Sequence, residues 1–99
     1  MKSIGNVTEE LVPRYDSHKS FYGKAVVRKH DDYSTLVSYK TDVAVVKFTD
    51  NKFSVQVLED VLTPTTLRHV KEFLKQHGVK AESKSQIIDD YAVHELVYY

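Results

Sequence analysis

The segment Leu62–Gly78, LTPTTLRHVKEFLKQHG, constrains the fold of this chain more than any other part of the sequence. Thr63 suits a helix N-cap, Pro64 suits the first helical position, where no backbone N–H is needed, and Gly78 suits the position after the last turn. Between these signals, apolar residues recur at spacings of three and four, as on the buried face of an amphipathic helix. That face consists of Leu67, Val70, Phe73, Leu74 and His77. A helix over about 64–77 with one such face requires a second layer to pack against.

The residues before this helix predict the sheet that would supply that layer. Residues 21–58 are rich in β-branched and aromatic residues, and turn-forming residues interrupt them at Asp31–Asp32, 40–42 and Asp50–Asn51. The most apolar run, Val43–Thr49, is short and β-branched, so it predicts a strand rather than a buried helix. We therefore expect an α+β fold, in which an antiparallel meander of about four strands packs against one main helix.

The two ends of the chain carry weaker patterns. Residues 1–20 have few apolar positions and are expected to form an irregular segment. The apolar residues of 79–99 fit either a short second helix or a final strand, and the sequence leaves this choice open. A length of 99 residues suits a single domain over 1–99 with one hydrophobic core.

Composition and motif content narrow the classes of function. Fourteen Lys and Arg residues balance 14 Asp and Glu residues, which argues against a strongly basic nucleic-acid wrapper and against an acidic mimic of DNA. The chain has no cysteine and three glycines, so thiol chemistry and a glycine-rich phosphate loop are excluded. Its paired carboxylates are neighbours in sequence, and no histidine pair has the helical spacing of metal ligands. The sequence therefore predicts no enzyme, no metal site and no cofactor. Without a long apolar run it also predicts no membrane partner and a cytoplasmic location.

Candidate binding residues fall into three groups. Arg68, Lys71 and Lys75 form a basic stripe on the helix face opposite Leu74, which suits either phosphate contacts or ordinary solvation. Seven tyrosines exceed the usual number, and tyrosine is common at interfaces. An acidic pair near the C-terminus is placed to imitate a few phosphates. The tyrosines predicted to bind are Tyr15, Tyr22, Tyr98 and Tyr99, and the acidic residues are Asp89 and Asp90.

Three segments resemble the shared pattern of a family of small uncharacterised proteins from phages and mobile elements of Gram-positive bacteria. They are Tyr15–Ala25, Val37–Val45 and Leu62–Leu74. The second segment carries an S-Y-x-T-x-V motif and the third a T-T-x-x-H-x-x-x-F-L motif. The motif residues are Ser38, Tyr39, Thr41 and Val43, then Thr65, Thr66, His69, Phe73 and Leu74. The chain departs from the pattern at Val57–Val61, where many members are rich in glycine and tryptophan, and after Gly78.

The resemblance implies an accessory protein that acts stoichiometrically against a host defence, as anti-CRISPR proteins do. The expected function is non-enzymatic inhibition of an RNA-guided nuclease of the Cas9 type, with the nuclease or its guide complex as the partner. The alternative is a small nucleic-acid-binding accessory protein of a phage or plasmid, whose binding would weaken steeply with salt. The partner and the oligomeric state stay open at this point.

Overall fold

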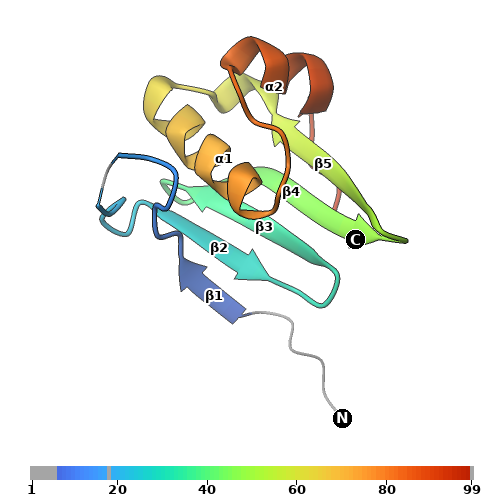
Figure 1. Cartoon of the computed structure of the whole chain (residues 1–99), viewed down its shortest axis with the longest axis horizontal. Coiled ribbons are helices and arrows are strands. Elements are labelled where there is room, and N and C mark those ends of the chain that lie inside the picture. Colours follow the sequence, from blue (N-terminus) through green and yellow to red (C-terminus); the bar gives the residue numbers. More distant parts are fainter. Residues whose placement is uncertain (1–6, 18, 99) are drawn as a thin grey trace.

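The computed structural model describes residues 7–17 and 19–98, in which six strands form one sheet and two α-helices cover one of its faces (Figure 1). The strands lie in the sheet in chain order; β1 to β5 pair antiparallel, and β6 is parallel to β5. The strands are β1 (Val7–Glu10), β2 (Ala25–Lys29), β3 (Tyr33–Ser38), β4 (Thr41–Thr49), β5 (Lys52–Leu58) and β6 (Ala92–Val93). The helices are α1 (Pro64–Gln76) and α2 (Lys84–Tyr91), with a short 3₁₀ turn, η1 (Glu59–Val61), before α1.

The main helix begins and ends at the signals that the sequence carries. The Thr63 side chain accepts a hydrogen bond from the Thr66 N–H at 3.2 Å, and Pro64 opens the helix. Gly78 adopts φ +75°, and the Val79 N–H donates to the Leu74 carbonyl at 2.9 Å, which closes the last turn. The predicted helix is confirmed, and Val70, Phe73 and Leu74 from its predicted apolar face are buried.

The prediction of about four antiparallel strands was wrong at both ends of the sheet. β1 lies in the segment expected to be irregular, because all four of its residues are exposed at the sheet edge and show no apolar alternation. The segment 79–99 forms both α2 and β6, and β6 makes the sheet mixed. With only two residues, β6 is too short to leave a periodic pattern.

Two tight turns connect the central strands. The predicted hairpin at Asp50–Asn51 is confirmed, and φ is positive at both residues, +53° and +64°. The predicted interruption at 40–42 is displaced, because the turn lies at Tyr39–Lys40 and β4 already begins at Thr41. The β3–β4 pairing shifts register near Leu36 and Val37, which is a β-bulge.

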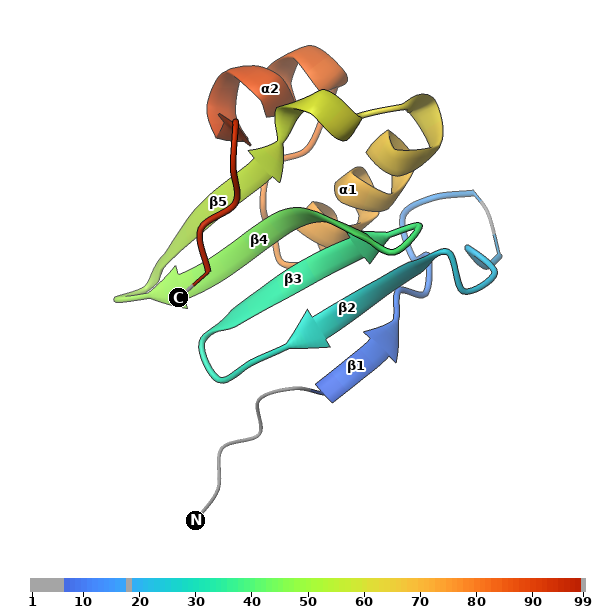
Figure 2. The same cartoon turned by 180° about the vertical axis from the view of Figure 1, so that it is seen from behind.

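The core lies between the sheet and the helices, and the C-terminal segment crosses the other face of the sheet (Figure 2). There the Gln56 side chain donates to the Val97 carbonyl at 2.9 Å and accepts from the Val97 N–H at 2.8 Å. The Tyr98 hydroxyl donates to Asp42, which also pairs with Arg28 at 2.6 Å. The two sheet faces are therefore covered by different parts of the chain.

Within the described residues, no helix is long and apolar enough to cross a membrane.

Candidate functional site

Three separate parts of the chain meet around one hollow of about 260 Å³ beside the N-terminal half of α1. The loop before β2, the β3–β4 turn and α1 each contribute side chains. We call this feature the α1 hollow. Its lining residues are Ser20, Phe21, Tyr22 and Lys24 from the loop, Tyr39 from the turn, and Thr65, Arg68 and His69 from α1.

A buried hydrogen-bonded group supports the floor of the α1 hollow. The Ser38 hydroxyl lies 2.8 Å from Nδ1 of His69 and 3.3 Å from the Thr66 hydroxyl. The His69 ring, only 2% exposed, also packs edge-on against Phe21, with 4.6 Å between ring centroids. Buried polar groups that bond one another hold a unique arrangement. This contact joins the two motifs that are far apart in sequence, because Ser38 ends β3 and His69 lies in α1.

The rim of the α1 hollow carries two tyrosines in an unusual backbone conformation. Tyr22 has φ +55° and Tyr39 has φ +51°, a region that costs non-glycine residues of order 1–3 kcal/mol. Their side chains are 75% and 48% exposed. The Tyr22 N–H donates to the Ser20 hydroxyl at 2.8 Å, which fixes the loop locally. Strain of this kind persists where the surrounding structure enforces it, and it is concentrated at ligand-binding sites.

The charge of the α1 hollow is positive. Lys24 and Arg68 line it, and none of the described lining residues is a carboxylate. The Lys24 ammonium lies 5.8 Å from the centroid of the Tyr39 ring, within cation–π range. The arrangement suits an anionic ligand that also offers a flat or apolar surface.

A second, smaller hollow of about 50 Å³ adjoins the first and shares Arg68 with it. Beneath it lies Glu72, whose carboxylate is 1% exposed. This carboxylate accepts the backbone N–H groups of Arg14, Tyr15 and Asp16 at 2.8, 2.9 and 2.9 Å. Glu72 therefore fastens the N-terminal loop to α1. Sequence reasoning missed this role, although Glu72 stands next to Phe73 in the buried stripe and three positions after His69.

The structure brings together only part of the predicted binding set. Tyr22 and Arg68 line the α1 hollow, while Tyr15, Lys71 and Lys75 line the adjoining one, so these five share a face. The acidic residues and the C-terminal tyrosine lie elsewhere. Asp89 and Asp90 are exposed on α2, Tyr98 lies on the opposite face of the sheet, and Tyr99 falls outside the described residues.

Several residues of the site lie outside the predicted binding set, although Phe21 and Tyr39 stand among the aromatic residues that suit binding. Lys24, Phe21 and Tyr39 enter the hollow because two turns with positive φ fold back toward α1. Thr65 and His69 were singled out only through the helix motif. The local signal that would have found Tyr39 is its place in a two-residue turn, where asparagine or glycine is usual.

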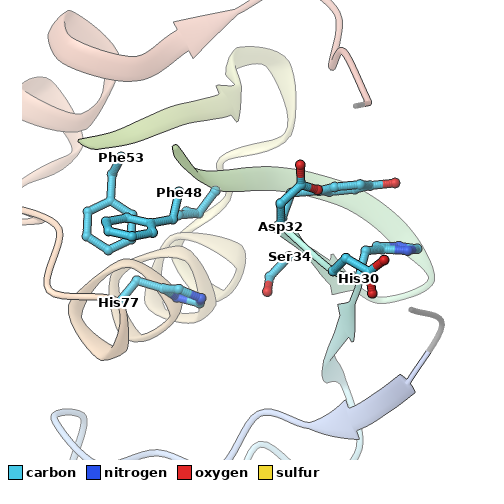
Figure 3. A pocket seen from close by; sticks show the side chains of 9 residues that line it. His30, Asp32, Ser34, Phe48, Phe53 and His77 are labelled. Carbon is cyan, nitrogen blue, oxygen red and sulfur yellow. The ribbon is translucent and has the colours of Figure 1, made fainter. Parts of the chain in front are cut away.

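Another hollow, of about 240 Å³, lies toward the opposite end of the sheet. Figure 3 shows Phe48, Phe53 and His77 on one side of it and His30, Asp32 and Ser34 on the other. The His30 ring stacks on Tyr33 at 4.3 Å between centroids, and Nδ1 of His77 bonds the Phe73 carbonyl at 2.9 Å. Within the described part of the chain, no three His, Cys, Asp or Glu side chains are grouped to hold a metal ion. The α1 hollow is the candidate binding site because it combines two cations with two exposed tyrosines of positive φ.

A model of a known protein family matches most of the chain. A model described as "Family of unknown function (DUF8033)" matches residues 9–90, a range that includes every residue lining the α1 hollow. Comparisons with curated proteins and with solved structures give no match.

Proposed function

We propose a non-enzymatic role for this chain, which belongs to the DUF8033 family of unknown function. In this role the chain binds the surface of a partner and blocks the partner's activity. One observation carries the proposal. Every residue that lines the α1 hollow comes from the three segments on which the resemblance to phage and mobile-element proteins rests: Tyr15–Ala25, Val37–Val45 and Leu62–Leu74. Tyrosine and arginine, which rim this hollow, are the residues that dominate binding energy at interfaces.

The proposed partner is an RNA-guided nuclease of the bacterial host, or its guide complex, in the cytoplasm. This choice of partner is supported by the resemblance, which implies an anti-CRISPR type of role. The mechanism would be occlusion, in which the chain covers part of the partner's surface. A standard interface needs about 800 Å² from each partner. The chain has a surface of 6198 Å², so it can supply that area from one face. The exposed rings of Tyr15, Tyr22 and Tyr39 (61%, 75% and 48%) supply rigid contact area on one face.

A nucleic-acid-binding accessory role is the second candidate. The observation that favours it is that Lys71 and Lys75 lie in the hollow next to Arg68 and Lys24, so four cations on this face stand against the carboxylates of Asp16 and Glu72. Binding to bare DNA or RNA through these side chains would release counterions and weaken steeply between about 50 and 200 mM salt.

A pull-down with purified tagged protein tests both candidates. The tagged chain is incubated with lysate of a Gram-positive host that carries an RNA-guided nuclease. Each sample is then split, and a non-specific nuclease is added to one half to digest free nucleic acid. We expect the RNA-guided nuclease to remain bound in stoichiometric amount after this digestion. Its cleavage of target DNA should fall in proportion to the added chain.

The variant Arg68→Glu tests whether this face makes the contact, and Lys52→Glu, an exposed residue at the β4–β5 hairpin, is the matched charge-reversal control. We expect the first change to abolish capture and the second to leave it intact. Loss of all partners on nuclease treatment would favour the nucleic-acid role instead. Capture that survives Arg68→Glu would contradict the assignment of the face.

A further inference from the structure

We infer that the α1 hollow binds one nucleoside phosphate. The phosphate lies beside Arg68 and Lys24, and the base lies against the rings of Tyr22 and Tyr39. This inference rests on the proposed function for the choice of face. It deepens that function, because it names the chemical group that the face would recognise in a guide-loaded partner.

Two cations from different elements line the hollow and would hold the phosphate. Arg68 comes from α1 and Lys24 from the residue before β2. A guanidinium has five N–H donors in a rigid fork, so Arg68 can hold a phosphate while it keeps another neighbour. The Thr65 hydroxyl lines the same hollow from the first turn of α1, where the helix dipole adds positive potential. None of the described lining residues is a carboxylate; the neighbouring carboxylate of Glu10 is bound by the Ser20 hydroxyl at 3.4 Å and the Gly23 N–H at 3.2 Å, and Asp16 lines the adjoining hollow.

The base end is defined by flat aromatic surface. The Tyr22 ring is 75% exposed and the Tyr39 ring 48% exposed, although both residues line a hollow. Aromatic rings beside a positive groove are what single-stranded nucleic-acid binders use to stack bases of any sequence. A simple anion would use the cations and leave both rings in water, so the combination selects a ligand that has a phosphate and a ring together.

Part of the site is held in place before any ligand arrives. The Tyr39 ring lies 5.8 Å from the His69 ring between centroids and 5.8 Å from the Lys24 ammonium. The buried Ser38–His69 contact at 2.8 Å fixes His69 in turn, and a hydrogen bond to Ser20 holds the backbone N–H of Tyr22. Preorganisation of this kind lowers the entropy lost on binding.

The size of the hollow suits one nucleotide unit. Its volume of about 260 Å³ lies just below the range of about 300–1,000 Å³ that is usual for small-molecule pockets. Such a ligand is either a free nucleotide or one unpaired nucleotide of a single strand, and the shared chemistry is the nucleoside phosphate.

Amide NMR spectra of the whole chain, titrated with four probes, test the inference. The probes are uridine monophosphate, uridine, inorganic phosphate and a single-stranded oligouridylate. We expect shifts at residues 20–24, 39–40 and 65–69, and affinity for uridine monophosphate at least about tenfold above that for uridine or phosphate alone.

Two variants remove one end of the site each. Arg68→Gln removes the charge, and Tyr22→Asn removes a ring while keeping a residue that tolerates positive φ. Each should weaken uridine monophosphate about tenfold, by loss of a charged hydrogen bond or of a stacked base. The matched controls Lys52→Gln and Phe53→Leu lie at the start of β5, beside the far end of β4, and should bind as the wild type does.

The four probes also separate the possible sources and failures. Tighter binding of oligouridylate than of the mononucleotide identifies a strand as the source, and equal binding identifies the free nucleotide; either supports the site. Phosphate that binds as tightly as uridine monophosphate overturns the inference, as does the absence of shifts around the hollow with every probe. A chain that ignores nucleotides yet captures the nuclease through Arg68 overturns only this inference and leaves the proposed function standing.

Discussion

At the scale of single residues, Glu72 is a carboxylate that binds backbone rather than a cation. Its two oxygens accept the N–H groups of Arg14, Tyr15 and Asp16, and the side chain is 1% exposed. Hydrogen bonds to a charged acceptor contribute more than neutral ones. Two side chains of α1 therefore hold the N-terminal loop: Glu72 binds these three N–H groups, and the Gln76 amide donates to the Val12 carbonyl at 2.8 Å.

We expect Glu72→Gln to lower the free energy of unfolding by about 1–3 kcal/mol, because an amide has one acceptor oxygen and turns donors toward the remaining N–H groups. Urea unfolding measures the loss, and faster amide exchange at residues 14–16 locates it. Glu95→Gln, at an exposed carboxylate near the C-terminus, is the control and should change neither. A Glu72→Gln chain as stable as the wild type would show that the loop is held by other contacts.

Tyr98 gives the fold a pH dependence at alkaline pH. Partial burial, followed by its hydrogen bond to Asp42 and the negative charge of that carboxylate, raises the pKa of Tyr98 from 10.0 to about 12. The folded state thus favours the protonated phenol. Its contribution to stability is complete below pH 10 and is lost as the pH rises from 10 to about 12.

Over that interval we expect the wild type to lose more stability than Tyr98→Phe, measured by urea unfolding at a series of pH values. Tyrosinate absorbance should show one group with a pKa near 12 in the wild type. Asp42→Asn should bring this pKa down, since it removes the negative charge. Identical pH profiles for the wild type and Tyr98→Phe would refute the contact.

At the scale of elements, the β3–β4 turn has a backbone conformation that lowers stability, and it places one of its side chains in the candidate site. Tyr39 and Lys40 have φ +51° and +69°, in a two-residue turn between paired strands. Asparagine and glycine are the usual residues there, because they adopt positive φ at low cost. Of the two, only Tyr39 lines the α1 hollow.

Lys40→Gly should therefore raise the free energy of unfolding by about 1 kcal/mol and leave binding at the α1 hollow intact. Tyr39→Asn should also raise stability but weaken binding, because it removes a ring from the rim. Thermal unfolding and the uridine monophosphate titration together measure both effects. A Lys40→Gly chain that melts below the wild type would argue against strain at this turn.

The elements also show what the sequence could and could not predict. The caps and the apolar face of α1 are local signals, so the helix was predictable to within a residue. The strands β2 to β5 were predictable from β-branched runs and turn residues. In contrast, β1 is an exposed edge strand and β6 has two residues, so their pairing depends on the rest of the fold. The α1 hollow depends on two positive-φ turns and the adjoining hollow on Glu72, and none of these features has a periodic signal.

At the scale of the whole molecule, the two sides of the sheet carry different surfaces (Figures 1 and 2). The helix side presents the basic, tyrosine-rimmed face, and the other side is crossed by the C-terminal segment that Gln56 and Asp42 bind. The chain has a net charge of zero, yet Lys24 and Arg68 make one hollow locally positive. A neutral protein with a local cationic site suits recognition of one spot on a partner rather than coating of a charged polymer.

Site-specific photo-crosslinking tests the central claim, that binding occurs at the α1 hollow, most directly. A benzophenone amino acid is placed at Tyr22 in one chain and at Phe53 in another, and both are irradiated in a Gram-positive host that carries an RNA-guided nuclease. We predict a crosslink to the nuclease or its guide RNA from position 22 and none from position 53. A crosslink to the same partner from position 53, with none from position 22, would contradict the account.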